Sequence, residues 1–127
     1  MDSSAGRDGS DTDDVQLFVA DDLLGIEVVS SDSGTAVTVA PTGEIDSVSA
    51  PVLRSALVSC LRPPCTQVIV NLTGVTFLNS AGLTVLAEAH RLARADGIEL
   101  AVRGGGRAVR RPLQITGLWE LMAVPAS

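Results

Sequence analysis

The stretch VIVNLTGVTFLNSAGL, residues 68–83, decides the fold of this chain. Its first part, residues 68–72, is a short continuous apolar run, which is typical of a β-strand buried on both faces of a sheet. The pair Asn79-Ser80 has the polar side chains that begin helices, and the apolar spacing after it predicts a helix that reaches about Asp96. A buried strand that leads into a helix is the repeating unit of α/β proteins.

Strands and helices alternate on both sides of this stretch. Before it, the sequence predicts strands at 23–29 and 35–41 and then a helix, which is capped by Ser49, has Pro51 in its first turn and ends before Pro63-Pro64. The strand 68–72 follows, and then a helix that begins at Asn79 and is ended by Gly97. After it the sequence predicts a strand at 98–103 and a helix at about 108–116, and residues 118–124 close the domain. The first two strands are joined by a polar turn, so we expect a hairpin. The whole order predicts an α/β fold, with a mixed sheet of four to five strands packed against three to four helices.

Length and composition indicate one folded domain. The chain has 127 residues, of which 46% are hydrophobic, and this is enough for one core. No apolar run approaches the roughly 18 residues of a membrane-spanning helix, and the first residues lack the basic and apolar regions of a signal peptide. We therefore expect a disordered acidic tail at residues 1–14, a single domain at 15–127, and a cytoplasmic protein without membrane contact.

The charge of the chain argues against a nucleic-acid partner. The formal net charge is -6, and the first fourteen residues carry -4 of it, because five aspartates there stand against Arg7. The remaining charge of about -2 does not favour direct binding to a phosphate backbone. Arginines nevertheless gather late in the chain, where they indicate either a solvated surface or a patch that faces a partner: Arg91, Arg94, Arg103, Arg107, Arg110 and Arg111.

Two cysteines, Cys60 and Cys65, flank an Arg-Pro-Pro segment with C-x4-C spacing. A zinc site usually needs C-x2-C pairs or nearby histidines, and neither accompanies these cysteines, so the sequence predicts no metal and no cofactor. Structural thiols are the first interpretation. A redox-sensitive pair is the alternative.

The helix that starts near Ser80 has a core face and a second, partly apolar face. At 100° per residue, the core face is predicted to carry Val85, Leu86, Ala89, Leu92 and Ala93. The opposite face carries Ser80, Leu83, Ala87, Arg91 and Arg94. Apolar Leu83 and Ala87, one and two turns after an exposed serine, indicate a docking surface centred on Ser80, although single exposed apolar residues are common.

The position of Ser80 suits a phosphate group. The first N–H groups of a helix lack partners within the helix, and the macrodipole favours negative charge there. A phosphoserine would add about -1.5 to -2 charges, which stabilises the helix start and repels an acidic or apolar partner. The alternative is that Ser80 or Asn79 is simply the N-cap, with a contribution of about 1 kcal/mol.

A catalytic serine is the rival interpretation from another class of function. Segment 79–83 lacks the leading glycine of the Gly-x-Ser-x-Gly elbow. The single histidine, His90, lies about 15 Å further along the same helix, too far to act as a base for Ser80. Segment 104–107, GGGR, likewise lacks the Lys-Ser/Thr of a nucleotide-binding P-loop. The sequence therefore predicts a protein that is not an enzyme.

Four motifs occur in order along the chain: TGEID at 42–46, APVLR at 50–54, the stretch 68–83, and ITGL at 115–118. In this order and spacing they resemble the STAS domain of bacterial anti-sigma factor antagonists, over about residues 22–125. In that family the strand-to-helix turn reads Asp-Ser-Ser/Thr-Gly-Leu. Ser80 and Gly82 match this pattern, whereas Asn79 and Ala81 replace the aspartate and the second hydroxyl residue.

The resemblance implies a switch and a partner. In that family an anti-sigma factor that is also a serine kinase phosphorylates the serine, the unphosphorylated protein binds the anti-sigma factor and frees the sigma factor, and a serine phosphatase resets the switch. Carried over, Ser80 is the phosphorylation site, and the partner-binding residues are Asn79, Ser80, Ala81, Gly82, Leu83, Ala87, Glu44 and Asp46. The alternative within the same fold is a STAS module of a ligand-sensing or transport complex, without sigma regulation.

Overall fold

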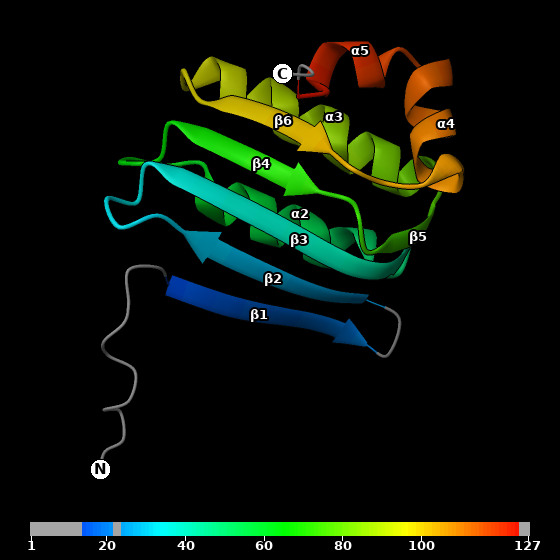
Figure 1. Ribbon diagram of the computed structural model, residues 1–127, viewed down its shortest axis with the longest axis horizontal. Helices are drawn as coiled ribbons and strands as arrows, with labels where there is room; N and C mark the ends of the chain where they lie inside the picture. The colour runs from blue at the N-terminus through cyan, green and yellow to red at the C-terminus, as the bar shows by residue number, and fades with distance from the viewer. Residues whose placement is uncertain (1–13, 22–23, 125–127) are drawn as a thin grey trace.

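Runs of β-branched and apolar residues form the strands, and apolar stripes at helical spacing form the helices (Figure 1). The computed structural model describes residues 14–21 and 24–124. In chain order these contain the strands β1 (Asp14–Asp21), β2 (Leu24–Ser30) and β3 (Ala36–Ile45), the helix α2 (Ala50–Cys60), the strands β4 (Gln67–Asn71) and β5 (Val75–Leu78), the helix α3 (Ser80–Ala95), the strand β6 (Glu99–Arg103), and the helices α4 (Arg107–Ile115) and α5 (Leu118–Met122).

The strands form one mixed sheet in the order β1-β2-β3-β4-β6. β1, β2 and β3 are antiparallel to one another in turn, whereas β3, β4 and β6 are parallel. The short β5 pairs in parallel with the last residues of β3. The α/β fold with a mixed sheet is thus confirmed, and so is the predicted hairpin, which is β2 and β3.

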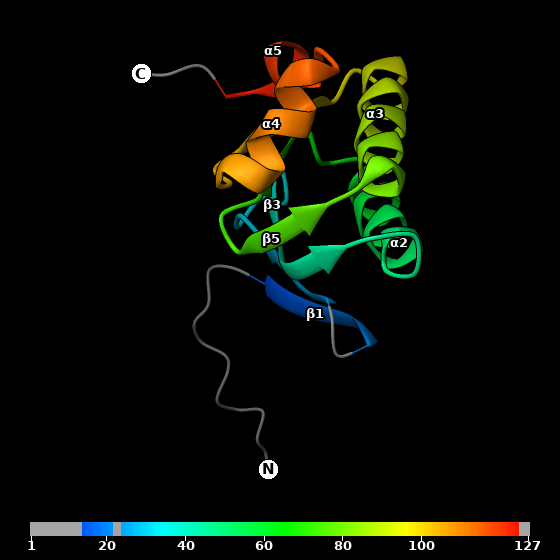
Figure 2. The same ribbon diagram turned by 90° about the vertical axis from the view of Figure 1, so that its right-hand side faces the viewer.

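Two helices cover one face of this sheet. α2 and α3 lie side by side on that face (Figures 1 and 2), and Arg54 of α2 forms a bidentate ion pair with Glu88 of α3, with both N···O distances at 2.9 Å. α4 packs against β5 and α5, while α5 packs against β6. After α5 the backbone returns to the sheet, because Val102 of β6 pairs with Ala123.

The core lies between the sheet and the helices α2 and α3, and α4 and α5 contribute Leu113 and Met122 to it. Its largest fully buried side chains are Leu24, Ile26, Ile45, Leu53, Leu57, Leu72, Leu86, Leu113, Met122, Val39, Val68 and Val70. Burial of each such side chain stabilises the fold by about 1.5–3 kcal/mol. The prediction that strand 68–72 is buried on both faces is wrong: Val68 and Val70 are buried, whereas Ile69 between them is partly exposed, so only one face of β4 is fully covered. Within the described ranges, no helix combines the length and the apolar character needed to cross a bilayer.

β1 is the largest departure from the predicted order. The sequence predicts a disordered tail through residue 14 and a first strand at 23–29, but Asp14 begins a strand that pairs with β2. The run of aspartates in the predicted tail reaches Asp14, the first residue of β1, so the sequence pattern does not show where the strand begins. The strand is defined instead by its hydrogen bonds to β2. The rest of the predicted tail, residues 1–13, lies outside the described residues.

Candidate functional site

The turn from β5 into α3 places Ser80 at the first position of the helix. Asn79 is the N-cap, because its Oδ1 accepts hydrogen bonds from the N–H groups of Ala81 and Gly82 at 2.9 and 3.3 Å. Of the two caps that the sequence allowed, the structure therefore has Asn79. Two first-turn N–H groups are satisfied without the serine side chain.

Ser80 itself is exposed. Its carbonyl oxygen accepts a hydrogen bond from Thr84 Oγ1 at 3.0 Å, whereas no described residue hydrogen bonds to its hydroxyl. The hydroxyl stands at the positive end of a helix of 16 residues. It is therefore open to solvent at a position that favours negative charge.

A second polar turn follows β3. Asp46 Oδ1 accepts hydrogen bonds from the N–H groups of Val48 and Ser49, each at 3.0 Å. These bonds, that from Ser49 first, hold the pKa of Asp46 below its ordinary value of 3.8, against a smaller opposing effect of desolvation. Asp46 is therefore charged at neutral pH. Glu44, two residues earlier, is exposed.

Ser49 belongs to this turn and stands at the N-cap of α2. The sequence predicts Ser49 as the N-cap, and it does occupy that position, but its side chain makes no hydrogen bond to the helix. Its buried Oγ instead accepts the N–H of Asp46 at 3.0 Å and donates to the carbonyl oxygen of Glu44 at 2.9 Å. A buried hydroxyl needs such partners, and here they fix the turn that carries Asp46.

The pairing of β3 with β5 brings the two turns to the same end of the sheet. Glu44 and Ile45 lie in register with the last residues of β5. The N–H of Asn79 then donates to the carbonyl oxygen of Ile45 at 3.1 Å. The structure thus places Glu44 and Asp46 beside the turn that carries Ser80, although the two segments are far apart in the sequence.

Gly82 allows close packing beneath the turn that carries Ser80. It is buried in the first turn of α3, and a Cβ at this position would lie 2.8 Å from Ile45 Cγ2 and still closer to Leu78 Cδ1. The absence of a side chain therefore allows α3 to approach β3 and β5 closely. Among the predicted partner-binding residues, Gly82 positions Ser80 and offers no exposed side chain.

The exposure of α3 differs from the ideal helical wheel at two places. Leu83 and Ala87, predicted on the exposed face, are half-buried, and Leu83 packs against the edge of the core. Leu92, predicted in the core, is half-buried as well, whereas Leu86 is fully buried. Residues of α4 lie across a groove from Leu83, so the covered arc of α3 is shifted at its first turn.

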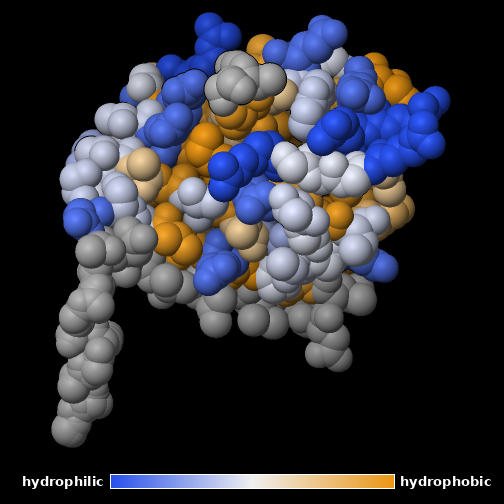
Figure 3. All heavy atoms as spheres, in the orientation of Figure 1, coloured by the Kyte–Doolittle hydropathy of each residue, from blue (hydrophilic) through white to orange (hydrophobic). Residues whose placement is uncertain are grey.

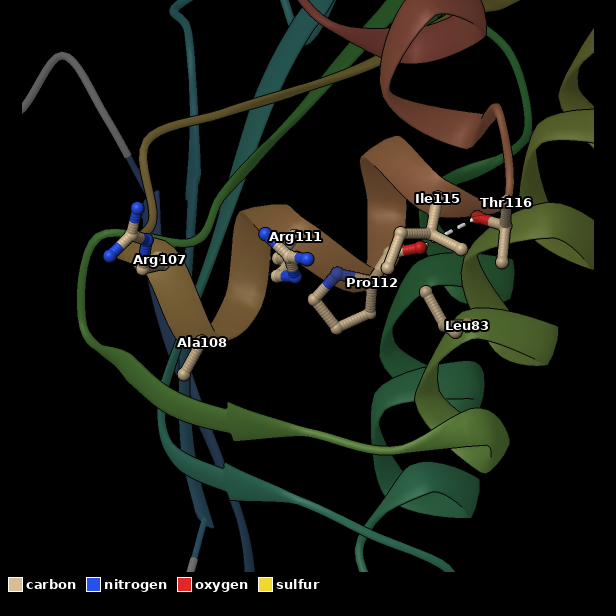
Figure 4. A pocket seen from close by; sticks show the side chains of 7 residues that line it. All are labelled: Leu83, Arg107, Ala108, Arg111, Pro112, Ile115 and Thr116. Atoms are coloured by element: carbon tan, nitrogen blue, oxygen red, sulfur yellow. Dashed lines mark hydrogen bonds between the residues drawn. The ribbon is translucent and has the colours of Figure 1, made fainter.

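A groove of about 680 Å³ runs between α3 and α4 (Figure 4). One lining residue, Leu83, comes from α3, and the others come from α4 and its C-cap: Arg107, Ala108, Arg111, Pro112, Ile115 and Thr116. Sequence reasoning missed this groove. The spacing i, i+4, i+7 of Ala108, Pro112 and Ile115 is a detectable apolar stripe, but no sequence pattern shows that α3 supplies the opposite wall.

The two cysteines lie away from Ser80. Cys60 Sγ donates to the carbonyl oxygen of Ala56 at 3.2 Å, and burial raises the pKa of this thiol. Cys65 is buried, and its Sγ donates to the carbonyl oxygen of Gln67 at 3.5 Å. Both are free thiols. α2 begins just after the Asp46 turn and ends at Cys60, and its 11 residues span about 16 Å, so the thiols belong to the far end of that helix.

The single histidine is on the same helix as Ser80. Burial lowers the pKa of His90, and the nearby charge of Arg94 adds to this effect. Ten residues of helix separate His90 from Ser80 by about 15 Å, so the imidazole does not reach the serine hydroxyl. Among the described side chains, no group of three His, Cys, Asp or Glu is arranged to hold a metal ion.

Known proteins share both the sequence pattern and the fold described above. The family model of the STAS domain matches residues 27–126. The anti-sigma-B factor antagonist of Staphylococcus epidermidis is 31% identical over 101 residues, which cover 80% of this chain and 92% of that protein. The anti-sigma-F factor antagonist RsfB of Mycobacterium tuberculosis is 29% identical over 93 residues, which cover 73% of this chain and 75% of that protein.

A solved structure agrees with these relatives. The crystal structure of an anti-sigma factor antagonist from Mycobacterium paratuberculosis is 30% identical to this chain, with a TM-score of 0.72. The match covers 86% of this chain and 92% of that one. The chain therefore belongs to the STAS domain family, together with these anti-sigma factor antagonists.

Proposed function

We propose that this protein is an anti-sigma factor antagonist that acts by binding, with Ser80 as its switch. In its unphosphorylated form it binds an anti-sigma factor of the serine-kinase type, and this binding releases the sigma factor. Phosphorylation of Ser80 by that kinase ends the binding, and a serine phosphatase restores it. The similarity to proteins named anti-sigma factor antagonists supports this class of partner.

The exposed hydroxyl of Ser80, to which none of the described residues hydrogen bonds, carries the proposal. Asn79 provides the cap of α3, so the serine is not needed to satisfy the helix N-terminus. The adjoining turn with Glu44 and Asp46 extends the polar surface around the hydroxyl. A kinase can therefore reach Ser80 Oγ without disturbing the fold, and a partner can cover the same surface when Ser80 is unmodified.

Phosphorylation would change the charge of this surface strongly. Transfer of a phosphoryl group from ATP to Ser80 Oγ releases ADP and the hydroxyl proton, and hydrolysis by the phosphatase returns serine and inorganic phosphate. The phosphate adds about -1.5 to -2 charges at the positive end of α3. Asp46 in the adjoining turn is ionised at neutral pH, as an ordinary aspartate is, and its hydrogen bonds lower its pKa further. A docked partner would then meet two neighbouring negative groups.

Asn79 caps the helix as an aspartate would, but without a negative charge. As an amide it accepts the same two N–H bonds that an aspartate would accept. It adds no negative charge next to a phosphate on Ser80, so the phosphorylated state avoids one repulsion. The proposal therefore includes a kinase that recognises this turn without a carboxylate at position 79.

The test begins with the anti-sigma factor recovered with the protein from its native cells. Calorimetry should show that Ser80→Glu weakens binding at least about tenfold, because the carboxylate is left unpaired in a desolvated contact. Ser80→Ala should retain binding but accept no phosphate from ATP. Ser33→Glu adds the same charge at an exposed residue near the opposite end of β3 and should bind like the wild type. Equal affinities of Ser80→Glu and the wild type would overturn the proposed switch.

The second candidate, a STAS module of a ligand-sensing or transport complex, gives a different result. The wild-type protein would then bind no anti-sigma factor and would instead be recovered with the components of that complex. Neither Ser80→Glu nor Ser80→Ala would change the activity of a sigma factor. These outcomes separate the two candidates in one set of variants.

A further inference from the structure

The groove between α3 and α4 has no part in the serine switch. In Figure 4 the side chain of Leu83 points from α3 toward Pro112 and Ile115 on α4. Ile115 is 72% exposed, although it lies beside these apolar neighbours. Apolar side chains gathered around a surface groove are one sign of an interaction site.

α4 has two apolar stripes, although one is sufficient to pack the helix against its own domain. Val109 and Leu113, four residues apart, are buried and attach the helix to the core. Ala108, Pro112 and Ile115 form the second stripe, which lines the groove. A helix that only packs on its own domain needs the first stripe alone, so the second stripe is available for a partner.

Positive charge borders this apolar surface. Arg107 and Arg111 line the groove, and both also line a hollow of about 360 Å³ together with Arg110 and Gln114. Strongly hydrophilic atoms accordingly gather over α4 in Figure 3. α4 contains no acidic residue, although the whole chain has a net charge of -6. Arg110 lies over the ring of Trp119, 4.8 Å from its centroid. Within the part of the chain that the structure describes, the ion pair is Arg54–Glu88, so Arg107 and Arg111 are available to the carboxylates of a partner.

The chemistry of the groove selects among possible occupants. The segment 1–13 of the chain is acidic, but its apolar residues are Met1 and Ala5, too few to fill an apolar groove. Pockets for small ligands bury most of the ligand surface, whereas the wall at Ile115 is largely open to solvent. A helix with an apolar stripe flanked by Asp or Glu complements both the groove and its arginines.

We propose that this groove docks an amphipathic, acidic helix of the anti-sigma factor. Its apolar side chains enter the groove between Leu83 and Ile115, and its carboxylates meet Arg107 and Arg111. Leu83 lies one turn after Ser80, so the docking surface runs without a break from the switch to α4. The inference rests on the proposed function and names the chemistry of its partner.

The test measures the affinity of the anti-sigma factor for the full chain and three variants. Arg111→Glu should weaken binding at least about tenfold at low ionic strength and less in concentrated salt, because the lost attraction is screened. Ile115→Ser should weaken binding about tenfold at both salt concentrations, since its contribution is apolar. Arg62→Glu makes the same charge change at an exposed residue after α2 and should stay within about twofold of the wild type. Unchanged thermal melting shows that each variant is folded.

The outcomes separate this proposal from the proposed function. If both groove variants bind within about twofold of the wild type while Ser80→Glu loses binding, the groove proposal is overturned and the switch stands. If the wild type binds no anti-sigma factor, both are overturned. If removal of residues 1–13 abolishes the effect of Arg111→Glu, the occupant is the chain's own N-terminal segment. If Ile115→Ser dissolves a dimer seen by sedimentation, the occupant is a second copy. Either result overturns the proposal.

Discussion

At the scale of single residues, each residue of the Ser80 turn has a different structural role. Asn79 caps α3, Ser80 presents its hydroxyl to solvent, and Gly82 allows the close contact with β3 and β5. The residue types are those that begin helices, so the sequence predicts where the turn is. It does not predict which oxygen makes which bond: Ser49 stands at the N-cap of α2, but its hydroxyl donates a hydrogen bond to the carbonyl oxygen of Glu44 and makes none to the helix.

Gly82→Ala tests the close contact under the turn. The new methyl group would overlap Leu78 and Ile45, so we expect the free energy of unfolding to fall by about 1–3 kcal/mol. Denaturant unfolding measures this change. Gly106→Ala is the matched control, because a Cβ there meets nothing within 4 Å and its φ of -81° suits alanine. Gly106 is the N-cap of α4, so this control should lose only the preference for glycine over alanine at a cap, about 0.5 kcal/mol. Equal stability of Gly82→Ala and the wild type would mean that the two side chains move aside without cost.

At the scale of elements, the ion pair Arg54–Glu88 joins the two helices that cover the sheet. The hydrogen bond from Arg54 and the attraction between the charges lower the pKa of Glu88 below its ordinary value of 4.5. The same hydrogen bond raises the pKa of Arg54. Both groups are on the surface, so the pair defines how α2 and α3 meet more than it stabilises them.

The pH dependence of stability follows from this pair and from Asp46. A carboxylate with a lowered pKa in the folded state contributes stability above its ordinary pKa, and this is lost as the pH falls through the lower value. The melting temperature should therefore change little between pH 7 and pH 5 on account of these groups, and should fall below about pH 4.5. Glu88→Gln should make the fall shallower. Glu120→Gln, at an exposed residue of α5, should leave its slope unchanged.

Elements with a strong pattern are predictable from the sequence, and those defined by pairing are not. α2, α3, β4 and β6 follow apolar runs or stripes, so their predicted positions agree with the structure within a few residues. β1 and β5 lack such signals, because the acidic tail conceals the first and the second has four residues that follow a glycine. Both exist because a neighbouring strand supplies their ladder bonds.

At the scale of the whole molecule, the site is assembled from segments that only the fold brings together. Ser80, Glu44 and Asp46 belong to sequence motifs, and the resemblance to the STAS family points to them. The groove has no such motif, because its two walls come from helices whose relative placement depends on the packing of α4 against β5. Sequence patterns describe one element at a time, so a surface shared by two elements escapes them.

Two truncations test where the folded domain begins. Removal of residues 1–13 should leave the melting temperature within about a degree or two, because this segment has too few apolar residues to stabilise a fold. Removal of residues 1–21 also deletes β1 and leaves β2 without its outer partner, so the melting temperature should drop by several degrees or more. A large drop in the shorter truncation would show that the acidic segment packs on the domain.

The pairing of Val102 with Ala123 affects the behaviour of the protein at high concentration. The N–H of Val124 donates to the carbonyl oxygen of Val102 at 2.9 Å, so the chain's own backbone occupies part of the outer edge of β6. Unpaired strand edges are where sheets of separate molecules join and aggregate. The β6 edge of this sheet is thus partly protected from pairing with another molecule. Ordered aggregation through backbone pairing is left mainly to the opposite edge, which β1 forms.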